Sequence, residues 1–540
     1  MSDAAEPALA HQELVRQLLS PSAYSAAPGE VRLLQTHVSS LFFAGDYVYK
    51  VKRPVNYGFL DYSTLARRKR FCRLEVALNR PMAPNVYLGV VEVRREDGRL
   101  YIAEEGGDKG EVVDYAVKMR RLSAESSLSA MLKADKVSPA DARRIGHVVA
   151  AFHARARRTA AIARQGGMAT VQRNILENFR QTQRYVGVTL SQDTYDDILA
   201  FSRAFLQAQA SFMARRAQEG RIVDGHGDLK ASDIYIVDGE VKILDCIEFN
   251  RRFRYGDAAS DIAFLAMDLD YHQHAGLSQA FVDAYVEASG DQEVTHLLGF
   301  FKCYRAYVRG KVNSFLLDDP TLSPARRQEA LDTAGAYFRL AHTYTRVFPC
   351  PAIIMVCGLM GTGKTTVAAE LARRWQGTHI SSDVTRKALT GLASTEHRYE
   401  SYGQGLYAPG MSQRTYDAML AQAKEAVAGG RLAILDATYR AAQERRQVVQ
   451  AAQAQGIPLW IVECTAPEDV VRRRVLLRTA AGASASDARW ELYPQQKAEW
   501  QPIPIHREAH GQRYIVLDTR GAPSRVMQRL LRELFLRVLR

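Results

Sequence analysis

Gly358-Leu-Met-Gly-Thr-Gly363-Lys364-Thr365 lies in the last third of a chain of 540 residues. An apolar run rich in β-branched residues, 353–357, precedes this segment, and a helical pattern, 366–375, follows it. Glycines let backbone N–H groups close around phosphate oxygens, and the next helix adds its positive N-terminal end. A strand, a glycine-rich loop and a helix in this order predict a P-loop that binds the phosphates of ATP.

Two side chains of this loop have a predicted chemical role. Lys364 is expected to reach the β- and γ-phosphates, and the hydroxyl of Thr365 is expected to ligate Mg²⁺. The other nucleotide-binding positions are predicted to be Gly358, Gly361, Thr362, Gly363 and Thr366.

Two aspartates end strand-like runs on the carboxyl side of the loop. Asp383 ends residues 378–383 and is followed by Arg386, and Asp436 ends residues 432–436. In an open parallel sheet, ligands lie at the carboxyl ends of the strands, so both carboxylates are expected to face the nucleotide. Asp436 fits the magnesium side or a water-positioning role, and Asp383 fits a base for the acceptor hydroxyl, with Arg386 holding an anionic group of the acceptor. Each aspartate also fits a helix N-cap after a strand.

A predicted helix over residues 470–478 carries Arg474 and Arg478 on one face, because they are four residues apart. Phosphoryl transfer requires cations that close over the phosphates in the transition state. A solvated basic face is the alternative interpretation of these arginines.

The loop, the Ser-Asp-x-x-Arg segment and the strand Ile-Leu-Asp-Ala-Thr-Tyr together resemble the P-loop kinases that include polynucleotide 5′-kinases, gluconate kinases and zeta-type toxins. The resemblance covers residues 352–517. It implies that Asp383 and Arg386 are an acceptor-side pair and that Arg474 or Arg478 is a lid arginine. It does not identify the acceptor.

A second phosphate site is predicted in the first half of the chain, at His226-Gly-Asp228-Leu-Lys230-Ala-Ser-Asp233. A short predicted hairpin follows, and its second strand ends at Asp245. In a kinase-type site the first carboxylate, here Asp228, orients the acceptor hydroxyl, and the later one holds Mg²⁺. The pattern resembles the aminoglycoside phosphotransferases of the protein-kinase-like fold.

This second resemblance implies three further ATP-binding residues. Lys50 is similar to the strand lysine that holds phosphate, with Lys52 on the same strand face as the alternative. Glu75 in the next helix is similar to its ion-pair partner. Met119 ends residues 115–119, which look like the hinge that borders adenine.

One residue departs from the phosphotransferase pattern. Asp233 stands where that family has asparagine. A carboxylate is still a hard oxygen donor for Mg²⁺, but it adds negative charge that Lys230 would have to offset. An inactive, nucleotide-sensing first domain therefore stays open, because a fold does not establish an activity.

The predicted organisation is a two-lobed α+β, protein-kinase-like domain over residues 1–348, followed by an α/β P-loop domain with a parallel sheet over residues 349–540. Strand-like alternation is expected over residues 41–51, and a linker-like segment over residues 115–122. The chain resembles a bacterial family that fuses these two domains.

Composition limits the partners. The net charge of +13 favours anionic ligands. The basic clusters at 67–70 and 472–474 are not interleaved with aromatic residues, so nucleic acid is a less favoured partner. No apolar run approaches the length of about 18 residues that a membrane span requires. The amino-terminal segment starts with acidic residues and has no continuous apolar core, so it is not expected to be a secretory signal. The six cysteines are scattered, without a Cys-x-x-Cys pair, which favours a cytoplasmic protein.

The leading hypothesis is an ATP- and Mg²⁺-dependent phosphotransferase acting on a hydroxyl group of a small molecule. Two alternatives are a nucleic-acid 5′-end kinase and an ATP-gated module whose first half is a pseudokinase. The helical stretch 175–212 contains Glu177, Asp193, Asp196 and Asp197 but no dense acidic cluster. A polycationic acceptor such as an aminoglycoside is therefore not favoured.

Overall fold

The computed structural model describes residues 5–25, 28–106, 109–346, 351–393, 396, 403–481, 489–503 and 513–538. The chain divides into two compact units. The first unit comprises residues 1–194 and 210–344, and the second comprises residues 195–209 and 345–540. The boundary expected at residue 349 lies outside the described residues, so the predicted domain limits stay a prediction.

The first unit begins with an antiparallel sheet of six strands in the order β1-β2-β3-β6-β4-β5. Helix α2 (Leu65–Asn79) starts at Thr64, whose hydroxyl accepts from Arg67 N, and packs against β4 and β6. The strands are β1 (Val31–Gln35), β2 (Ser39–Ala44), β3 (Tyr47–Lys52), β4 (Tyr87–Glu96), β5 (Arg99–Glu104) and β6 (Glu111–Arg120).

The structure confirms one expectation for this sheet in more detail and overturns another. The strand-like segment 41–51 contains two strands, β2 and β3, because Gly45 adopts a left-handed φ of 58° and reverses the chain. The linker expected at residues 115–122 is mostly strand, because Tyr115, Val117 and Met119 point into the core between the sheet and α2 and continue β6 to Arg120.

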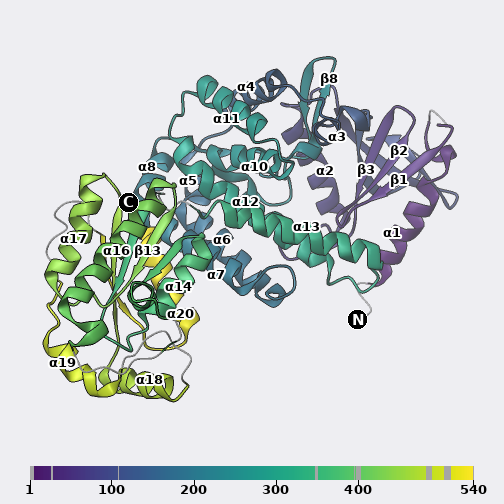
Figure 1. Ribbon diagram of the computed structural model, residues 1–540. Helices are drawn as coiled ribbons and strands as arrows, with labels where there is room; N and C mark the ends of the chain where they lie inside the picture. The colour runs from purple at the N-terminus through teal and green to yellow at the C-terminus, as the bar shows by residue number, and fades with distance from the viewer. Residues whose placement is uncertain are drawn as a thin grey trace. The chain divides into compact units, whose positions relative to one another are not determined.

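The rest of the first unit is mainly helical (Figure 1). Two short strand pairs interrupt it: β7 (Ile222–Asp224) with β10 (Tyr255–Asp257), and β8 (Ile234–Val237) with β9 (Glu240–Ile243). The helices are α1 (Ala5–Leu18), α3 (Leu128–Lys133), α4 (Pro139–Arg155), α5 (Ala160–Gly166), α6 (Met168–Thr182), α8 (Ala210–Gln218), α9 (Arg251–Arg254), α10 (Ala258–Tyr271), α11 (Ala275–Ser289), α12 (Val294–Leu316) and α13 (Pro324–Thr343).

The second unit is built on a parallel sheet of five strands in the order β12-β13-β11-β14-β15. The strands are β11 (Ala352–Cys357), β12 (Thr378–Ser381), β13 (Leu432–Asp436), β14 (Leu459–Thr465) and β15 (Arg513–Asp518). Every residue of the central strand β11 is buried. Because helices cover both faces of a parallel sheet, its strands are apolar runs rather than alternating ones.

Helices α16 and α17 pack on one face of this sheet, where Met419 and Val448 join a core with Met355 and Leu435 (Figure 1). The helices of the second unit are α14 (Lys364–Trp375), α15 (Ser382–Ala388), α16 (Pro409–Ala428), α17 (Ala442–Ala454), α18 (Glu468–Ala481), α19 (Tyr493–Ala498) and α20 (Pro523–Val538). The two-lobed α+β fold and the α/β parallel sheet confirm the predicted fold class.

Two global properties accompany this fold. None of the helices in the described ranges is both long and apolar enough to span a bilayer. The five cysteines that the structure describes are all buried free thiols, and Cys350 lies outside the described residues.

Helix α7 (Gln192–Ala208) is the unexpected element, because its residues from 195 onward belong to the second unit. Asp197 forms a buried ion pair with Arg374 of α14, and each side chain is only 4% exposed. Asp196 accepts a hydrogen bond of 2.7 Å from Gln528 of α20. The Phe201 ring meets that of Phe535 edge to face, with centroids 5.7 Å apart. Helix α7 therefore packs on the helix that starts at the P-loop lysine.

Replacing Arg374 with alanine is expected to destabilise the second unit by about 3–5 kcal/mol, because it removes the guanidinium from a buried carboxylate. The adjacent Arg373, 55% exposed and paired with Glu370, provides the matched control, and Arg373→Ala should cost less than about 1 kcal/mol. All four tryptophans lie between residues 375 and 500, so urea unfolding followed by tryptophan fluorescence reports on the second unit. Equal losses for the two variants would contradict the structural role of α7.

Candidate functional site

The P-loop joins the end of β11 to the start of α14, as the sequence predicts. Gly358, Gly361 and Gly363 have φ angles of 134°, 71° and 87°, which L side chains rarely adopt. A Cβ atom on Gly358 would lie 2.3 Å from the carbonyl oxygen of Cys464. The loop can therefore close only with glycine at these positions. Some of its backbone N–H groups are engaged within the protein, because Gly358 donates to the carbonyl oxygen of Thr438 and Met360 donates to Gln496 Oε1.

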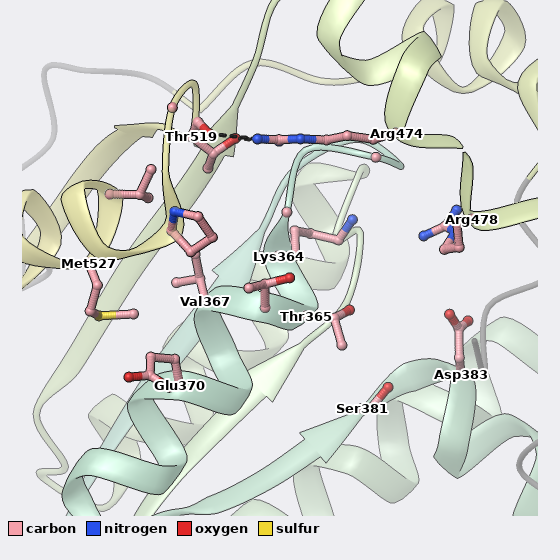
Figure 2. A pocket seen from close by; sticks show the side chains of 16 residues that line it. Lys364, Thr365, Val367, Glu370, Ser381, Asp383, Arg474, Arg478, Thr519 and Met527 are labelled. Carbon is pink, nitrogen blue, oxygen red and sulfur yellow. Dashed lines mark hydrogen bonds between the residues drawn. The ribbon is translucent and has the colours of Figure 1, made fainter. Parts of the chain in front are cut away.

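A cavity of about 470 Å³ opens beside this loop (Figure 2). Eight of the predicted site residues line it: Gly361, Gly363, Lys364, Thr365, Thr366, Asp383, Arg474 and Arg478. Gly358, Thr362, Arg386 and Asp436 do not line it, although all four lie in the segments around it.

Lys364 is the buried cation of the cavity. Its Nζ donates to the carbonyl oxygen of Leu359 at 2.9 Å, so the lysine side chain closes the loop on itself. Burial lowers the pKa of Lys364 below its ordinary value, although Asp436 opposes the shift. Burial removes water from this ammonium group, and a bound phosphate would interact favourably with it in place of the water.

Asp383 and Arg478 line the other side of the cavity, and Arg386, which does not line it, pairs with Asp383. Asp383 lies in the first turn of α15 rather than at the end of a strand, and Arg386 Nη1 donates to it at 3.2 Å. The Arg386 guanidinium stacks 4.7 Å from the ring centre of Tyr407. Figure 2 shows Arg478 directed towards Asp383 across the cavity. Within the described residues, Nη2 of Arg478 is buried without a hydrogen-bond partner.

Burial lowers the pKa of Arg478, and the negative charge of Asp383 only partly offsets this effect. A buried guanidinium with an unused N–H is costly unless a ligand supplies an acceptor. The arrangement at Arg478 therefore fits an anion.

Arg474 is engaged differently from Arg478. Its Nη1 donates to Thr519 Oγ1 at 3.0 Å, and its Nη2 donates to the Thr519 carbonyl oxygen at 2.7 Å (Figure 2). Thr519 Oγ1 in turn donates to the carbonyl oxygen of Thr362 at 2.8 Å. Arg474 therefore ties the segment after β15 to the P-loop.

The sequence interpretation missed the wall of the cavity that this segment forms. The residues concerned follow β15 or begin α20: Thr519, Gly521, Pro523, Val526 and Met527. The end of the strand-like run 513–518 could have indicated these residues. An additional parallel strand brings its carboxyl end to the same edge of the sheet as the P-loop.

Asp436 ends β13 and is buried. Nε2 of His379, on the neighbouring strand β12, lies 3.2 Å from Asp436 Oδ2. The carboxylate is thus on the loop side of the sheet, as expected from the strand, and its predicted role at the metal stays a prediction.

In the first unit, Lys50 on β3 meets both predicted partners. Its Nζ donates to Glu75 Oε1 at 2.8 Å and to Asp245 Oδ1 at 2.6 Å. Burial alone would lower the pKa of Lys50. The negative charges of Asp245 and, next in size, Glu75 outweigh the effect of burial and raise this pKa. Asp245 adopts a φ of 65°, an uncommon conformation for a residue with a side chain.

Lys52 forms a second ion-pair group behind Lys50. Its Nζ donates to Glu75 Oε2 at 2.6 Å and also contacts Glu248, which accepts from the Tyr62 hydroxyl. Lys52 is 1% exposed and Lys50 is 13% exposed. Of the two lysines, Lys50 is therefore the one nearer to solvent and to Asp245. Sequence spacing alone left this choice open.

The loop after β7 is held by structural contacts beneath it. Asp261 accepts from the backbone N–H groups of His226 at 2.6 Å and Gly227 at 2.9 Å. Above them, Lys230 Nζ donates to Asp228 Oδ2 and to Asp233 Oδ2, both at 2.5 Å. Lys230 thus supplies the charge compensation that the aspartate at position 233 requires.

The carboxylates of this loop have opposite pKa shifts. Burial would raise the pKa of Asp228, but Lys230 lowers it below the ordinary value. Burial raises the pKa of Asp233 to about 6. Asp245 adds to this increase, and Lys230 opposes it. Within the described chain, no group of three His, Cys, Asp or Glu side chains forms a complete metal cage. Magnesium sites usually need only one or two carboxylates together with substrate phosphates.

Met119 lies at the end of β6, opposite Val48 of β3, and is 8% exposed. Its side chain joins the core between the sheet and α2. The strand ends one residue later, so the position borders the connection to the helical part. Its predicted contact with adenine stays a prediction.

Comparison with known proteins identifies relatives of the whole chain. The uncharacterized protein Rv2004c of Mycobacterium tuberculosis is 31% identical over 470 residues, which are 86% of this chain and 90% of the relative. The uncharacterized protein Mb2027c of Mycobacterium bovis matches to the same extent. The chain belongs to this family.

The second unit of this family member also matches, over residues 353–503, a family model described as an AAA domain. The predicted fusion organisation is confirmed, because these relatives extend over both halves of the chain and this model lies in the second.

Among solved structures, the chain is similar to a choline/ethanolamine kinase family protein from Mesorhizobium loti, at 13% identity and a TM-score of 0.38, covering 62% of this chain and 99% of that one. It is also similar to a gluconokinase from Sinorhizobium meliloti, at 16% identity and a TM-score of 0.24, covering 34% and 93%. At these TM-scores the two likenesses support no assignment.

Replacing Gly361 with alanine should destabilise the second unit by about 2–4 kcal/mol, because it combines backbone strain with overpacking. The new Cβ would lie 2.9 Å from Val471 Cγ1, at a φ of 71°. Gly456→Ala is the control, with a similar φ of 63° but no atom within 4 Å, and should cost about 1 kcal/mol. Tryptophan-detected urea unfolding measures both, and equal losses would exclude the close packing described for the loop.

Asp233→Asn should raise the stability of the first unit above pH 6. The folded pKa of about 6 exceeds the ordinary value, so the folded state binds the extra proton and wild-type stability falls as the pH rises from about 4 to 6. The variant does not lose stability in this way. The free energy of unfolding of its first unit should therefore equal that of the wild type near pH 4 and exceed it by about 1–3 kcal/mol at pH 7.5.

Scanning calorimetry without Mg²⁺, with tryptophan fluorescence to assign the second-unit transition, measures this difference. Asp332→Asn, at an exposed position of α13, is the control. An advantage that does not change with pH would contradict the raised pKa.

Proposed function

We propose that the protein is an ATP-dependent phosphotransferase with two kinase-type sites, one in each unit, and that each site transfers the γ-phosphoryl group to a hydroxyl of a small molecule. One observation carries the proposal: Lys364, Thr365, Asp383 and Arg478 converge on one cavity of about 470 Å³ beside the P-loop. The independent lysine–carboxylate group around Lys50 and Asp245 supports a second site.

In the second unit, the loop amides and Lys364 bind the phosphate chain of ATP. Asp383 accepts the proton of the acceptor hydroxyl as the new O–P bond forms and the bond to the β-phosphate oxygen breaks, which releases ADP. Arg478 stabilises the charge that develops on the transferred group. Arg386 holds Asp383 and binds the acceptor, and Arg474 keeps the segment after β15 against the loop.

In the first unit, Lys50 binds the phosphates and Glu75 fixes its position. Asp228 accepts the proton of the acceptor hydroxyl, with the same bonds formed and broken. The low pKa of Asp228 keeps it ionised. Lys230, which contacts Asp228, lies where it can offset charge on the transferred group.

The donor types present fit Mg²⁺, which prefers hard oxygen ligands. Thr365 and Asp436 would hold the ion in the second unit, and Asp233 and Asp245 would hold it in the first. A bound Mg²⁺ neutralises phosphate charge and orients the phosphoryl group for in-line attack. The glycine cradle and the unpartnered Nη2 of Arg478 are the features that fit the nucleotide's phosphates.

A second candidate function for the first unit is nucleotide sensing without transfer. The bridge from Lys230 to both Asp228 and Asp233 supports it, because a lysine that neutralises the catalytic carboxylate weakens it as a base. Burial and the nearby carboxylates of Asp245 and Asp228 raise the pKa of Asp233 even beside Lys230. A further cation such as Mg²⁺ would stabilise these carboxylates, which favours an active first unit.

The test uses full-length protein with ATP, Mg²⁺ and a metabolite extract, and measures ADP release together with acceptors that gain the mass of one phosphoryl group. Lys364→Ala should lower second-unit turnover by at least about 100-fold, and Asp228→Asn should abolish transfer by the first unit. Lys424→Ala and Asp238→Asn, both at exposed positions, are the controls.

Turnover that persists in the Lys364→Ala, Asp228→Asn double variant would refute the enzyme proposal. Loss of all transfer in Lys364→Ala alone would support a sensing first unit. Transfer to 5′-hydroxyl oligonucleotides, and to no metabolite, would replace the small-molecule acceptor with nucleic acid.

A further inference from the structure

Helix α12 presents two arginines to the loop that carries Asp228. Arg305 Nη1 donates to the carbonyl oxygen of Gly227 at 3.0 Å, and its Nη2 lies 3.8 Å from Asp261 Oδ1. Arg309 follows four residues later and therefore lies on the same face of the helix. Arg305 supports the loop from below, and Arg309 is the next cation along the same surface.

The surroundings of Arg309 connect it to the far end of the same loop. Its guanidinium lies 5.4 Å from the ring centre of Tyr337 on α13. The Tyr337 hydroxyl donates to Asp268 Oδ1 at 3.4 Å, and Asp268 Oδ2 accepts from the backbone N–H of Ala231 at 2.8 Å. Helices α10, α12 and α13, which lie side by side in Figure 1, thus meet at residues 227–231.

Arg309 has no carboxylate contact among the residues that the structure describes, and its buried Nε has no hydrogen-bond partner there. The positive charge of Arg309 still acts on Asp228. Burial raises the pKa of Asp228, whereas Lys230 and, to a smaller extent, Arg309 lower it. The Asp228 side chain is 31% exposed and Arg309 is half-buried. Both groups can therefore be reached by a solute.

A second cation of α12 is also without a carboxylate partner in the described chain. Lys311 Nζ donates to the side-chain oxygens of Asn178 at 2.6 Å and Gln181 at 2.9 Å, which are neutral. Burial lowers the pKa of Lys311 to about 8. Cations that are removed from water without paired anions are costly, so α12 carries a positive potential that an anionic ligand would relieve.

We propose that Arg309 binds an anionic group of the acceptor whose hydroxyl is presented to Asp228, so that the substrate of the first unit is an acidic, phosphorylated or carboxylated metabolite. The proposal rests on the proposed function. The planar guanidinium suits phosphate, sulfate and carboxylate oxygens. The cation also repels positively charged acceptors such as aminoglycosides, and this repulsion is a means of specificity.

The test is a titration with sodium sulfate at constant ionic strength, monitored by calorimetry. The full-length protein carries Lys364→Ala to weaken the anion site of the P-loop, and Mg²⁺ with the β,γ-imido analogue of ATP is present at saturation. Arg309→Gln should weaken sulfate binding at least about 10-fold, the loss typical of one charged hydrogen bond. Arg309→Lys, which keeps the charge and loses the planar fork, should weaken it less.

Arg326→Gln is the matched control, because Arg326 lies on α13 of the same unit, is 74% exposed and pairs with Glu329. Equal sulfate affinities for the parent, Arg309→Gln and Arg309→Lys would overturn the proposal, as would an equal loss in Arg326→Gln or no saturable binding by the parent. If Arg309→Gln does not fold, the comparison of Arg309→Lys with the parent decides.

The failure of this inference is distinguishable from failure of the proposed function, because the titration measures binding without turnover. Asp228-dependent transfer together with sulfate binding that ignores Arg309 would refute only the anionic acceptor. Arg309-dependent sulfate binding without any Asp228-dependent transfer would refute only the phosphotransferase activity of the first unit.

Discussion

The buried carboxylate of Glu75 is the constraint on which the first unit depends. It is inaccessible to solvent, and each of its oxygens accepts from a different lysine of β3. An ionised carboxylate in this position is stable only while both lysines remain. The same lysines also form ion pairs with Asp245 and Glu248. One network of ion pairs therefore connects α2, β3 and the segment after β9. The position of Lys50 between Glu75 and Asp245 follows from this network.

In the second unit, the comparable constraint is the close packing of the P-loop backbone rather than a network of ion pairs. At the P-loop, the chain passes so close to Cys464 and to Val471 that no side chain fits on Gly358 or Gly361. Lys364 and Arg478, which line the cavity beside this loop, are half-buried, and burial lowers the pKa of each of them. In the first unit, Asp245 and Glu75 outweigh burial and raise the pKa of Lys50. In the second unit the neighbouring carboxylates do not outweigh burial, so an anionic ligand would stabilise its two cations.

Much of this could be predicted because the signals were local. The loop at residues 358–365 and the strand ending at Asp436 combine motif and context within about 20 residues, and the pairing of Lys50 with Glu75 follows from a resemblance. The cavity wall at Thr519 and Met527 was missed, because the end of the strand-like run 513–518 points to it only once the place of that strand in the sheet is known. The role of Lys52, with Glu248 and Tyr62, depends on contacts between segments up to 196 positions apart, and periodicity does not encode such contacts.

Helix α7 changes how the modularity of this chain should be understood. Its residues 195–209 are translated long before the sheet to which they belong, and the chain returns to the first unit at residue 210 before the second unit is made. A fragment that begins near residue 345 would lack this helix, and the ring of Phe535 and the guanidinium of Arg374 would lose the partners that α7 gives them. One helix of the second unit is therefore synthesised before the rest of that unit, and a fragment that begins near residue 345 is not the complete unit.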